Sequence, residues 1–440
     1  MIRSIHTICA AALLFAAWGL RAQELPKIPE KLTLTEAKRL ALAGNPGMDA
    51  LLARVEAAEA VVGQARSVRK PQLGLTAAAT WLDEVSLGNG NDGGTPYYQT
   101  SLGANWLLFD GFASRFRIKA AQADRGVSLA EWQDGRRLLA EGVATTFLNC
   151  LLAQEASRVT ERDAEFNRSL LDEARKRLDA GAGARVDVLN FSVRVRTAEN
   201  TLLGNRRNLR AARQVLAALL GLEPGDLPQA TVLVSLAEFA GRSLPEAGHA
   251  IEQAFAKRPD LQRLDRTIAQ LQALVKSRQG EFMPKIFAQA GYELARTEDA
   301  HVNASRDADS YVGLALSWNI FDGRRRHHAV AEAKAQLRSA TAGRNQLCNE
   351  IASQVRRALD NLDTTGKQYA NQREITDMSR EIRSIVHKEY LSGLSPLTRL
   401  NEVQTDLVRA EGALAQTQIL QAQAAEVLDS TTGTNIPAKQ

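Results

Sequence analysis

Few residues of this 440-residue chain have the types and spacing that chemistry at a site requires. His327 and His328 are metal-ligand types, but adjacent positions on a helix point about 100° apart, so we do not expect the pair to hold one metal ion. Gly181-Ala182-Gly183 lacks the lysine and the preceding strand of a phosphate-binding loop. No local Ser-His-Asp or Cys-His pattern indicates a nucleophile. The sequence therefore predicts neither an enzyme nor a metal or cofactor site.

The composition indicates long helices. Aromatic residues make up only 5% of the chain, and Ala, Leu, Arg, Gln and Glu dominate its long middle stretches. Lysines and arginines are interleaved with acids along these stretches, which indicates solvated helix faces and argues against nucleic-acid binding. Cys150 and Cys348 do not occupy equivalent positions in the two halves of the chain, so no disulfide framework is predicted.

The same features recur in the same order about 212 positions apart, which indicates duplication of a whole module. These features are two prolines, a Trp-to-Asp-Gly segment and a glycine: Pro46, Pro71, Trp106 to Gly111 and Gly181 recur as Pro259, Pro284, Trp318 to Gly323 and Gly393.

The first 22 residues have the layout of a secretory signal peptide. Arg3 precedes an apolar run from Ile8 to Leu20, and Ala22 is the expected cleavage position. A single membrane anchor is the alternative, although the run is short of the roughly 20 apolar residues that a spanning helix needs.

The remaining chain divides into two repeats, 23–221 and 244–431, separated by a linker at 222–243 and followed by a tail at 432–440. Each repeat is predicted to hold short helices, two strands, a long helix and a second helix. The first copy places these at 34–68, 71–83, 97–109, 112–178 and 186–221; the second places them at 247–280, 284–296, 310–321, 324–391 and 397–430.

The four predicted strands alternate apolar and polar residues with period two. Their length of roughly 10 to 12 residues suits a tilted strand that crosses a bilayer, with aromatic residues near the interfaces. The expected interface aromatics are Trp81, Trp106, Tyr292 and Trp318. Hairpins on a soluble protein are the alternative, because alternation describes any half-buried antiparallel sheet. Open sheet edges are not tolerated in hydrocarbon, so several chains must contribute to one closed sheet, and three chains would give twelve strands.

The two long helices are near 67 residues each, hence roughly 100 Å long. Their partner helices carry heptad seams that include Phe191 and Leu202 in the first copy and Leu400 and Leu407 in the second, which predicts antiparallel coiled-coil hairpins. The hairpin tips are tight turns, because glycine supplies a helix C-cap and proline starts the next helix. The tip residues are Gly181, Gly183, Arg185, Gly393, Ser395 and Pro396.

The signal peptide, the duplicated helix-strand-strand-helix order, the two Phe-Asp-Gly strand endings and the Gly-x5-Asp-Val-Leu tip at Gly181 to Leu189 together resemble the TolC family of outer-membrane efflux proteins. The resemblance covers nearly all of the predicted mature chain. It implies a mostly α, mixed α and β homotrimer, with a twelve-stranded barrel in the outer membrane and a helical tunnel through the periplasm. It also implies that the tips meet a periplasmic adaptor protein, which links them to an inner-membrane pump of the RND, ABC or MFS type.

The resemblance further implies a constriction at the periplasmic mouth, formed by residues just after the second tip. Arg399 and Glu402 stand where the family has two acidic residues, and Tyr390 and Asp187 match positions that hold the mouth closed. Ser395 replaces a frequent arginine. Residues 399 and 402 share a helix face, so Arg399 can neutralise Glu402 and cation selectivity should be weaker than in an all-acidic mouth.

The sequence therefore predicts a passive exit duct in the outer membrane of a Gram-negative cell. Opening is expected to untwist the inner hairpins and to break contacts around Asp187, Tyr390 and Glu402. The alternative is a periplasmic coiled-coil adaptor or scaffold. An adaptor of that kind would need lipoyl-like and barrel segments flanking one hairpin, whereas this chain has two hairpins and alternating membrane-like strands. Nothing in the sequence identifies the cargo.

Overall fold

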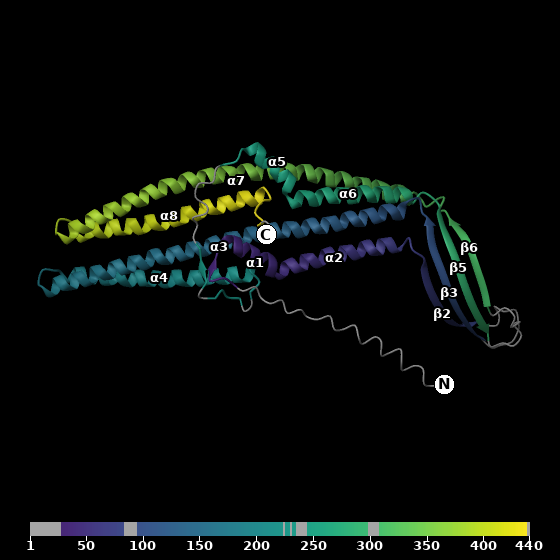
Figure 1. The fold of residues 1–440 in the computed structure, drawn as a ribbon, viewed down its shortest axis with the longest axis horizontal. Coiled ribbons are helices and arrows are strands. Elements are labelled where there is room, and N and C mark those ends of the chain that lie inside the picture. Colours follow the sequence, from purple (N-terminus) through teal and green to yellow (C-terminus); the bar gives the residue numbers. More distant parts are fainter. Residues whose placement is uncertain are drawn as a thin grey trace, which may run out of the picture.

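The computed structural model describes residues 28–82, 95–222, 225–228, 231–234, 244–297 and 308–437. The chain is an elongated bundle of antiparallel helices that carries a four-stranded sheet at one end and two helical hairpin tips at the other (Figure 1). The predicted signal peptide at 1–22, much of the linker at 222–243, both strand-connecting loops and residues 438–440 lie outside the described residues.

Eight helices are present in the described residues, four in each repeat, and their bounds lie within about two residues of the predicted ranges. The first repeat holds α1 (Leu34–Gly44), α2 (Pro46–Ser67), α3 (Ala113–Asp179) and α4 (Arg185–Leu219). The second holds α5 (Ala247–Lys257), α6 (Pro259–Gly280), α7 (Arg325–Leu391) and α8 (Leu397–Thr431). Helices α3 and α7 are each 67 residues long.

The prolines place the helix breaks that the sequence predicts. Asn45 and Arg258 precede Pro46 and Pro259 and have extended backbones, with ψ of 120° and 122°, because proline disfavours helical conformation in the residue before it. The Asn45 side chain then accepts a hydrogen bond of 2.8 Å from the Gly47 amide and caps α2.

The sheet holds β2 (Gln72–Leu82), β3 (Thr95–Phe109), β5 (Lys285–Thr297) and β6 (Ala308–Ser317), all antiparallel and in the order β2-β3-β5-β6. Its register aligns Leu75 with Leu102, Leu102 with Tyr292 and Ala290 with Val312. Because side chains alternate along a strand, this register collects most of the apolar residues of all four strands on one face.

The apolar face of the sheet is uncovered in the single chain. Leu73 is 77% exposed, Val312 is 89% exposed and Leu314 is 75% exposed. The opposite face is polar, and there Gln99 donates a hydrogen bond of 2.5 Å to Glu293. Within the described strands, β2 and β6 each have one unpaired edge.

The predicted fourth strand at 310–321 was too long at its end. Strand β6 stops at Ser317, which pairs with Lys285, the first residue of β5. Residues beyond Ser317 have no partner strand in the described sheet, so their alternating pattern does not produce a ladder.

A second, parallel pair of strands was missed. β1 (Lys31–Leu32) pairs with β4 (Val232–Leu233). Two-residue strands are too short to show a periodicity, and their pairing joins segments about 200 positions apart, so no local pattern indicates it. Leu32 and Leu233 are buried against α3, α4 and α8, in a core that includes Phe147, Leu216 and Ile419.

The heptad seams pack as predicted. The buried seam residues are Phe191, Val195, Ala198, Leu202 and Leu216 on α4, and Leu400, Val403, Leu407, Ala410, Ala424 and Leu428 on α8. Helix α4 lies along α3 and helix α8 lies along α7, so each repeat ends in one long antiparallel hairpin (Figure 1).

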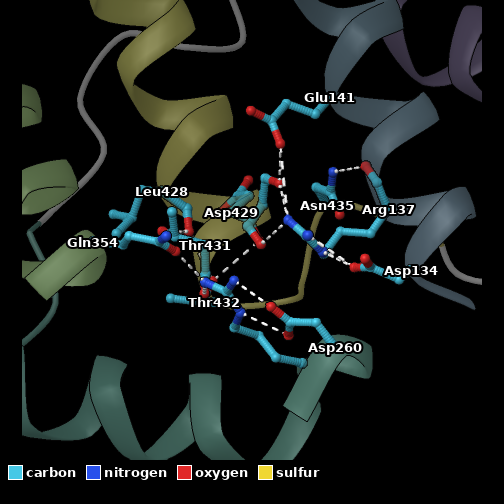
Figure 2. A network of polar contacts seen from close by, with 12 residues as sticks. Asp134, Arg137, Glu141, Asp260, Gln354, Leu428, Asp429, Thr431, Thr432 and Asn435 are labelled. Atoms are coloured by element: carbon cyan, nitrogen blue, oxygen red, sulfur yellow. Dashed lines mark hydrogen bonds and ion pairs between the residues drawn. The ribbon is translucent and has the colours of Figure 1, made fainter. Parts of the chain in front are cut away.

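A buried polar network joins the two repeats at mid-length. Arg137 of α3 donates hydrogen bonds to Asp134 Oδ1 (2.8 Å) and to Ser430 Oγ (3.0 Å) at the end of α8, and Asn435 donates to the Arg137 carbonyl (2.8 Å) (Figure 2). The buried ion pair between Lys38 of α1 and Glu426 of α8 makes a further connection. The C-terminal end of α8 is thereby fixed to the first repeat.

Arg258 extends this network into the second repeat. Its guanidinium donates to Asp260 Oδ2 (2.6 Å), to Gln354 Oε1 of α7 (2.7 Å) and to the carbonyl of Thr431 at the end of α8 (3.4 Å). Burial alone would raise the pKa of Asp260, but the hydrogen bond and charge of Arg258, helped by the charge of Arg137, hold this pKa below its usual value of 3.8.

This network predicts an acid-sensitive contribution to stability. Because the folded-state pKa of Asp260 is lowered, its contribution is fully present above the unfolded-state pKa and is lost as pH falls through the folded-state pKa. Asp260→Asn should lower the free energy of unfolding by about 1 to 3 kcal/mol at pH 7, since buried Arg258 loses its anionic partner. The same variant should lose less stability than the wild type below pH 4.

Urea unfolding followed by circular dichroism across this pH range measures both effects. Asp172→Asn is the matched control, because Asp172 is exposed and pairs with Arg175 on the same helix at 3.6 Å. Equal acid dependence in wild type and Asp260→Asn would contradict the assignment.

Candidate functional site

The two hairpin tips end in the same turn. Gly181 and Gly393 have φ of +74° and +77°, a conformation that favours glycine. In the first tip the Ala182 amide donates to the Arg177 carbonyl (2.9 Å), and in the second the Leu394 amide donates to the Glu389 carbonyl (2.8 Å). Both are Schellman turns, which satisfy the last helical carbonyls and reverse the chain tightly.

The remaining predicted tip residues lie around these turns. Arg185 begins α4 and is exposed, and Pro396 is the N-cap of α8. Gly183 lies so close to the end of α3 that an added Cβ would be 2.8 Å from the Leu178 nitrogen. Ser395 occupies the equivalent position of the second tip and is half-buried. All of the predicted tip residues therefore lie together at the end of the molecule opposite the sheet (Figure 1).

Tyr390 lies in an apolar cluster that joins the two hairpins near the tips. The cluster contains Leu170, Leu171, Ala174, Phe191, Val195, Val386, Tyr390, Leu400 and Val403, from α3, α4, α7 and α8. Phe191 and Leu400 are completely buried, and Tyr390 is 8% exposed. The cluster holds the first-copy tip against the second-copy tip.

Arg177 is the tip residue that the sequence analysis missed. Its guanidinium lies 5.2 Å from the centre of the Tyr390 ring and donates to the Leu391 carbonyl at 3.3 Å, and thus crosses from α3 to α7. It also donates to Glu173 at 3.1 Å. Arginine is common in the last turn of a helix, because its positive charge is stabilised by the helix dipole. Its position alone therefore did not indicate a contact between hairpins.

Asp187 acts on Tyr390 through charge. Burial raises the pKa of the Tyr390 hydroxyl; Arg177 opposes this shift, and the carboxylates of Asp187 and Glu173 add to it. Within the described residues no hydrogen bond joins Asp187 to Tyr390, so the charged group in direct contact with the Tyr390 ring is the Arg177 guanidinium. Asp187 itself is half-buried in the first turn of α4.

Arg399 and Glu402 form the pair that their spacing predicts. Arg399 Nη1 donates to Glu402 Oε2 at 2.7 Å, with the two side chains 52% and 59% exposed. The pair lies near the start of α8, next to the tip. Its carboxylate is therefore partly neutralised by a neighbour on the same helix face.

Polar contacts also join the two hairpins farther from the tips than the apolar cluster around Tyr390. Glu411 of α8 pairs with Arg162 of α3 at 3.4 Å and with Arg380 of α7 at 3.1 Å. Gln404 of α8 donates to Asp163 of α3 at 2.8 Å. The two hairpins are thus joined by both apolar and charged groups along their length.

The predicted interface aromatics lie on the sheet and at its base. Trp81, Tyr292 and Trp318 are 71%, 48% and 55% exposed, and Trp106 is 44% exposed. The indole N–H of Trp106 donates to the Arg69 carbonyl (2.8 Å), and that of Trp318 donates to the Phe282 carbonyl (3.1 Å). These two tryptophans are equivalent in the repeats and mark the level at which strands give way to helices, whereas Trp81 lies toward the far end of the sheet.

Comparison with known proteins agrees with this architecture. Among the described residues, no helix combines the length and the apolar character needed to cross a membrane. A family model described as "Outer membrane efflux protein" matches residues 38–222 and 250–434, one match for each repeat. The chain belongs to this family. It is an outer-membrane efflux channel protein of the TolC family, a family of channels and not of enzymes.

Relatives and solved structures cover most of the chain. The outer membrane efflux protein BepC of Brucella suis is 23% identical over 95% of this chain and 88% of its own length. The CyaE protein of Bordetella pertussis is 25% identical over 76% of this chain and 69% of its own length. The crystal structure of the outer membrane protein VceC of Vibrio cholerae has a TM-score of 0.75 and 17% identity, covering 91% of this chain and 96% of that one.

The tip geometry predicts that Arg177 restrains opening. Arg177→Gln should raise the open-state population by about fivefold, because a cation–π contact with one hydrogen bond is worth on the order of 1 kcal/mol. Single-channel recording in planar bilayers measures this population. Arg175→Gln, which removes an exposed arginine two residues away, should behave as wild type; equal behaviour of all three proteins would contradict the role of Arg177.

Proposed function

We propose that three copies of this chain close a twelve-stranded barrel in the outer membrane, continued by a helical tunnel through the periplasm. In this assembly the channel is a passive exit duct. A periplasmic adaptor contacts the tips and connects them to an inner-membrane pump of the RND, ABC or MFS type. The cleaved signal peptide at 1–22 exports the chain.

The observation that carries this proposal is an apolar sheet face with unpaired edges. The exposed side chains of Leu73, Leu75, Val312 and Leu314 would be costly in water, at about 25 cal/mol for each square ångström of apolar surface. Unpaired backbone groups of β2 and β6 would in turn be costly in lipid, where no water can bond to them. Immersion of the apolar face in lipid removes the first cost, and pairing of β6 of one copy with β2 of the next removes the second once the sheet closes.

The polar face of the same sheet supports a water-filled interior. Gln99 and Glu293 point to this face and bond to each other, and Thr76, Ser101 and Asp309 share it by register. A lumen lined by hydroxyl, amide and carboxylate groups passes hydrated solutes. A soluble adaptor or scaffold would gain nothing from an uncovered apolar face on the other side.

At the end of the molecule opposite the sheet, features of the hairpin tips support the proposed docking and gating. Gly181, Gly393 and Pro396 are exposed there, so the tight turns are accessible to another protein. Opening requires the two hairpins to separate near the tips, which breaks the Arg177 contacts with Tyr390 and Leu391. Glu402 and Arg399 then line the widened mouth.

Membrane fractionation tests the proposal. The full chain should be recovered in the outer membrane as a species that runs as a trimer in detergent without heating and as a monomer after heating. A soluble periplasmic monomer or dimer would contradict the duct and favour the scaffold. Leu314→Glu and the matched change Ala315→Glu separate the faces: the first should abolish the trimer, because Leu314 faces lipid, and the second should be tolerated.

The charge pair at the mouth predicts the ion selectivity. Arg399→Gln should increase the preference for cations over anions, because three Glu402 carboxylates lose their neighbouring positive charges. Glu402→Gln should reduce it, and Glu402→Ala should also change the single-channel conductance. Reversal potentials in a salt gradient measure the preference. Arg409→Gln, which disrupts an exposed pair farther along α8, is the control, and unchanged selectivity in the first two variants would exclude this pair from the constriction.

A further inference from the structure

A small hollow lies where β3 gives way to α3 in the first repeat. Its volume is about 150 Å³, and Arg69, Leu108, Phe112 and Arg115 are among its lining residues. Leu108 is 45% exposed and Phe112 is 56% exposed, so the hollow opens beside apolar side chains at the surface. Two arginines and exposed apolar residues thus lie together around this hollow.

Both arginines of this hollow lack an acidic partner. Neither Arg69 nor Arg115 forms a salt bridge with any residue that the structure describes. Asp110 also lines the hollow, but its carboxylate is buried and accepts hydrogen bonds from the Ser114 amide (2.7 Å) and hydroxyl (3.2 Å). This carboxylate is thus hydrogen-bonded to the first turn of α3.

The equivalent junction of the second repeat carries different residues at the positions of Arg69 and Arg115. Trp106 donates to the carbonyl of residue 69 and Trp318 donates to that of residue 282, which makes Phe282 the structural counterpart of Arg69. His327, the counterpart of Arg115, packs edge-on against Phe282 at 5.0 Å between ring centres. An aromatic pair therefore stands where the first repeat has two unpaired arginines.

The capping interaction is kept in both copies, so the difference is confined to the lining. Asp322 accepts hydrogen bonds from the Arg326 amide (3.3 Å) and guanidinium (2.7 Å), as Asp110 does from Ser114. The Arg326 guanidinium lies 5.0 Å from the Phe282 ring centre. The fold of the junction thus does not require arginine at positions 69 and 115.

We propose that Arg69 and Arg115 bind the phosphate headgroup of an anionic phospholipid in the periplasmic leaflet of the outer membrane. This inference rests on the proposed function, which places the apolar sheet face in lipid and the junction at the membrane boundary. A guanidinium matches phosphate oxygens with paired, charge-assisted hydrogen bonds. The exposed side chains of Leu108 and Phe112 would contact the acyl chains of this lipid close to its headgroup.

The charge of the site favours an anionic over a zwitterionic lipid. A phosphodiester with a neutral glycerol headgroup leaves its negative charge to the two arginines, whereas a choline headgroup brings a positive charge next to them. Free phosphate has the charge but no acyl chain to contact Leu108 and Phe112. The three ligands therefore separate the contributions of charge and of apolar contact.

Native mass spectrometry of the full-length protein in mild detergent tests the site. Purified wild type is titrated with phosphatidylglycerol, with phosphatidylcholine of the same chains and with inorganic phosphate. We expect one phosphatidylglycerol per chain to bind about tenfold more tightly than phosphatidylcholine, with phosphate a weak competitor. Arg69→Gln/Arg115→Gln should remove the preference.

Two further variants control for charge and folding. Arg324→Gln/Arg325→Gln removes the same charge from exposed residues of the second junction and should keep the preference. Arg69→Phe/Arg115→His copies the aromatic pair of the second repeat, whose junction accommodates it, and should lose the preference while the protein folds normally. Retained preference in both Arg69 and Arg115 variants would overturn the proposal, as would competition by phosphate at the potency of the lipid.

The same proteins distinguish this inference from the proposed function. If the wild type is not an outer-membrane trimer, the proposed function fails. If every variant is an outer-membrane trimer but the lipid preference does not depend on Arg69 and Arg115, only the lipid site fails. Loss of the trimer in these variants with lipid preference unchanged would assign the arginines to a contact between subunits and would also overturn the lipid site.

Discussion

Strand register in the four-stranded sheet is the constraint on which the rest of the structure depends. A shift of one residue between β3 and β5 would move Leu102 away from Tyr292 and send half of the apolar side chains to the polar face. The register unites the two repeats, because β3 belongs to the first and β5 to the second. It also fixes where the long helices begin, since Trp106 and Trp318 bond to the backbone at the base of the sheet.

The long helices α3 and α7 connect the sheet to the hairpin tips. Helices α3 and α7 each run unbroken for 67 residues, and the mid-length network of Arg137 and Arg258 fixes the end of α8 against both repeats (Figure 2). The hairpins are therefore held at the sheet and at mid-length, and near the tips they are joined by the Tyr390 cluster, Arg177 and ion pairs.

Local patterns predicted the elements and the packing within each helical hairpin, but not the contacts between segments far apart in the chain. Pro46 and Pro259 locate helix breaks, and Gly181 and Gly393 locate the tips, because each acts on its own backbone. The end of β6 at Ser317, the Arg177 stacking on Tyr390 and the Arg258 hydrogen bonds to α7 and α8 depend on partners far along the chain, which no periodicity reveals. The differing junctions were also missed, because the hollow beside Arg69 and the contact of Phe282 with His327 form only once the sheet and the long helices are in place.

The central claim is that one face of the sheet contacts lipid and the other contacts water. Spin labels placed singly from Val312 to Ser317 on β6, in protein reconstituted into liposomes, test it most directly through collisions with oxygen and with a water-soluble nickel complex. The account predicts alternation with period two, with positions 312, 314 and 316 accessible to oxygen and positions 313, 315 and 317 accessible to nickel. Uniform access of nickel to all six positions, or alternation of the opposite phase, would contradict it.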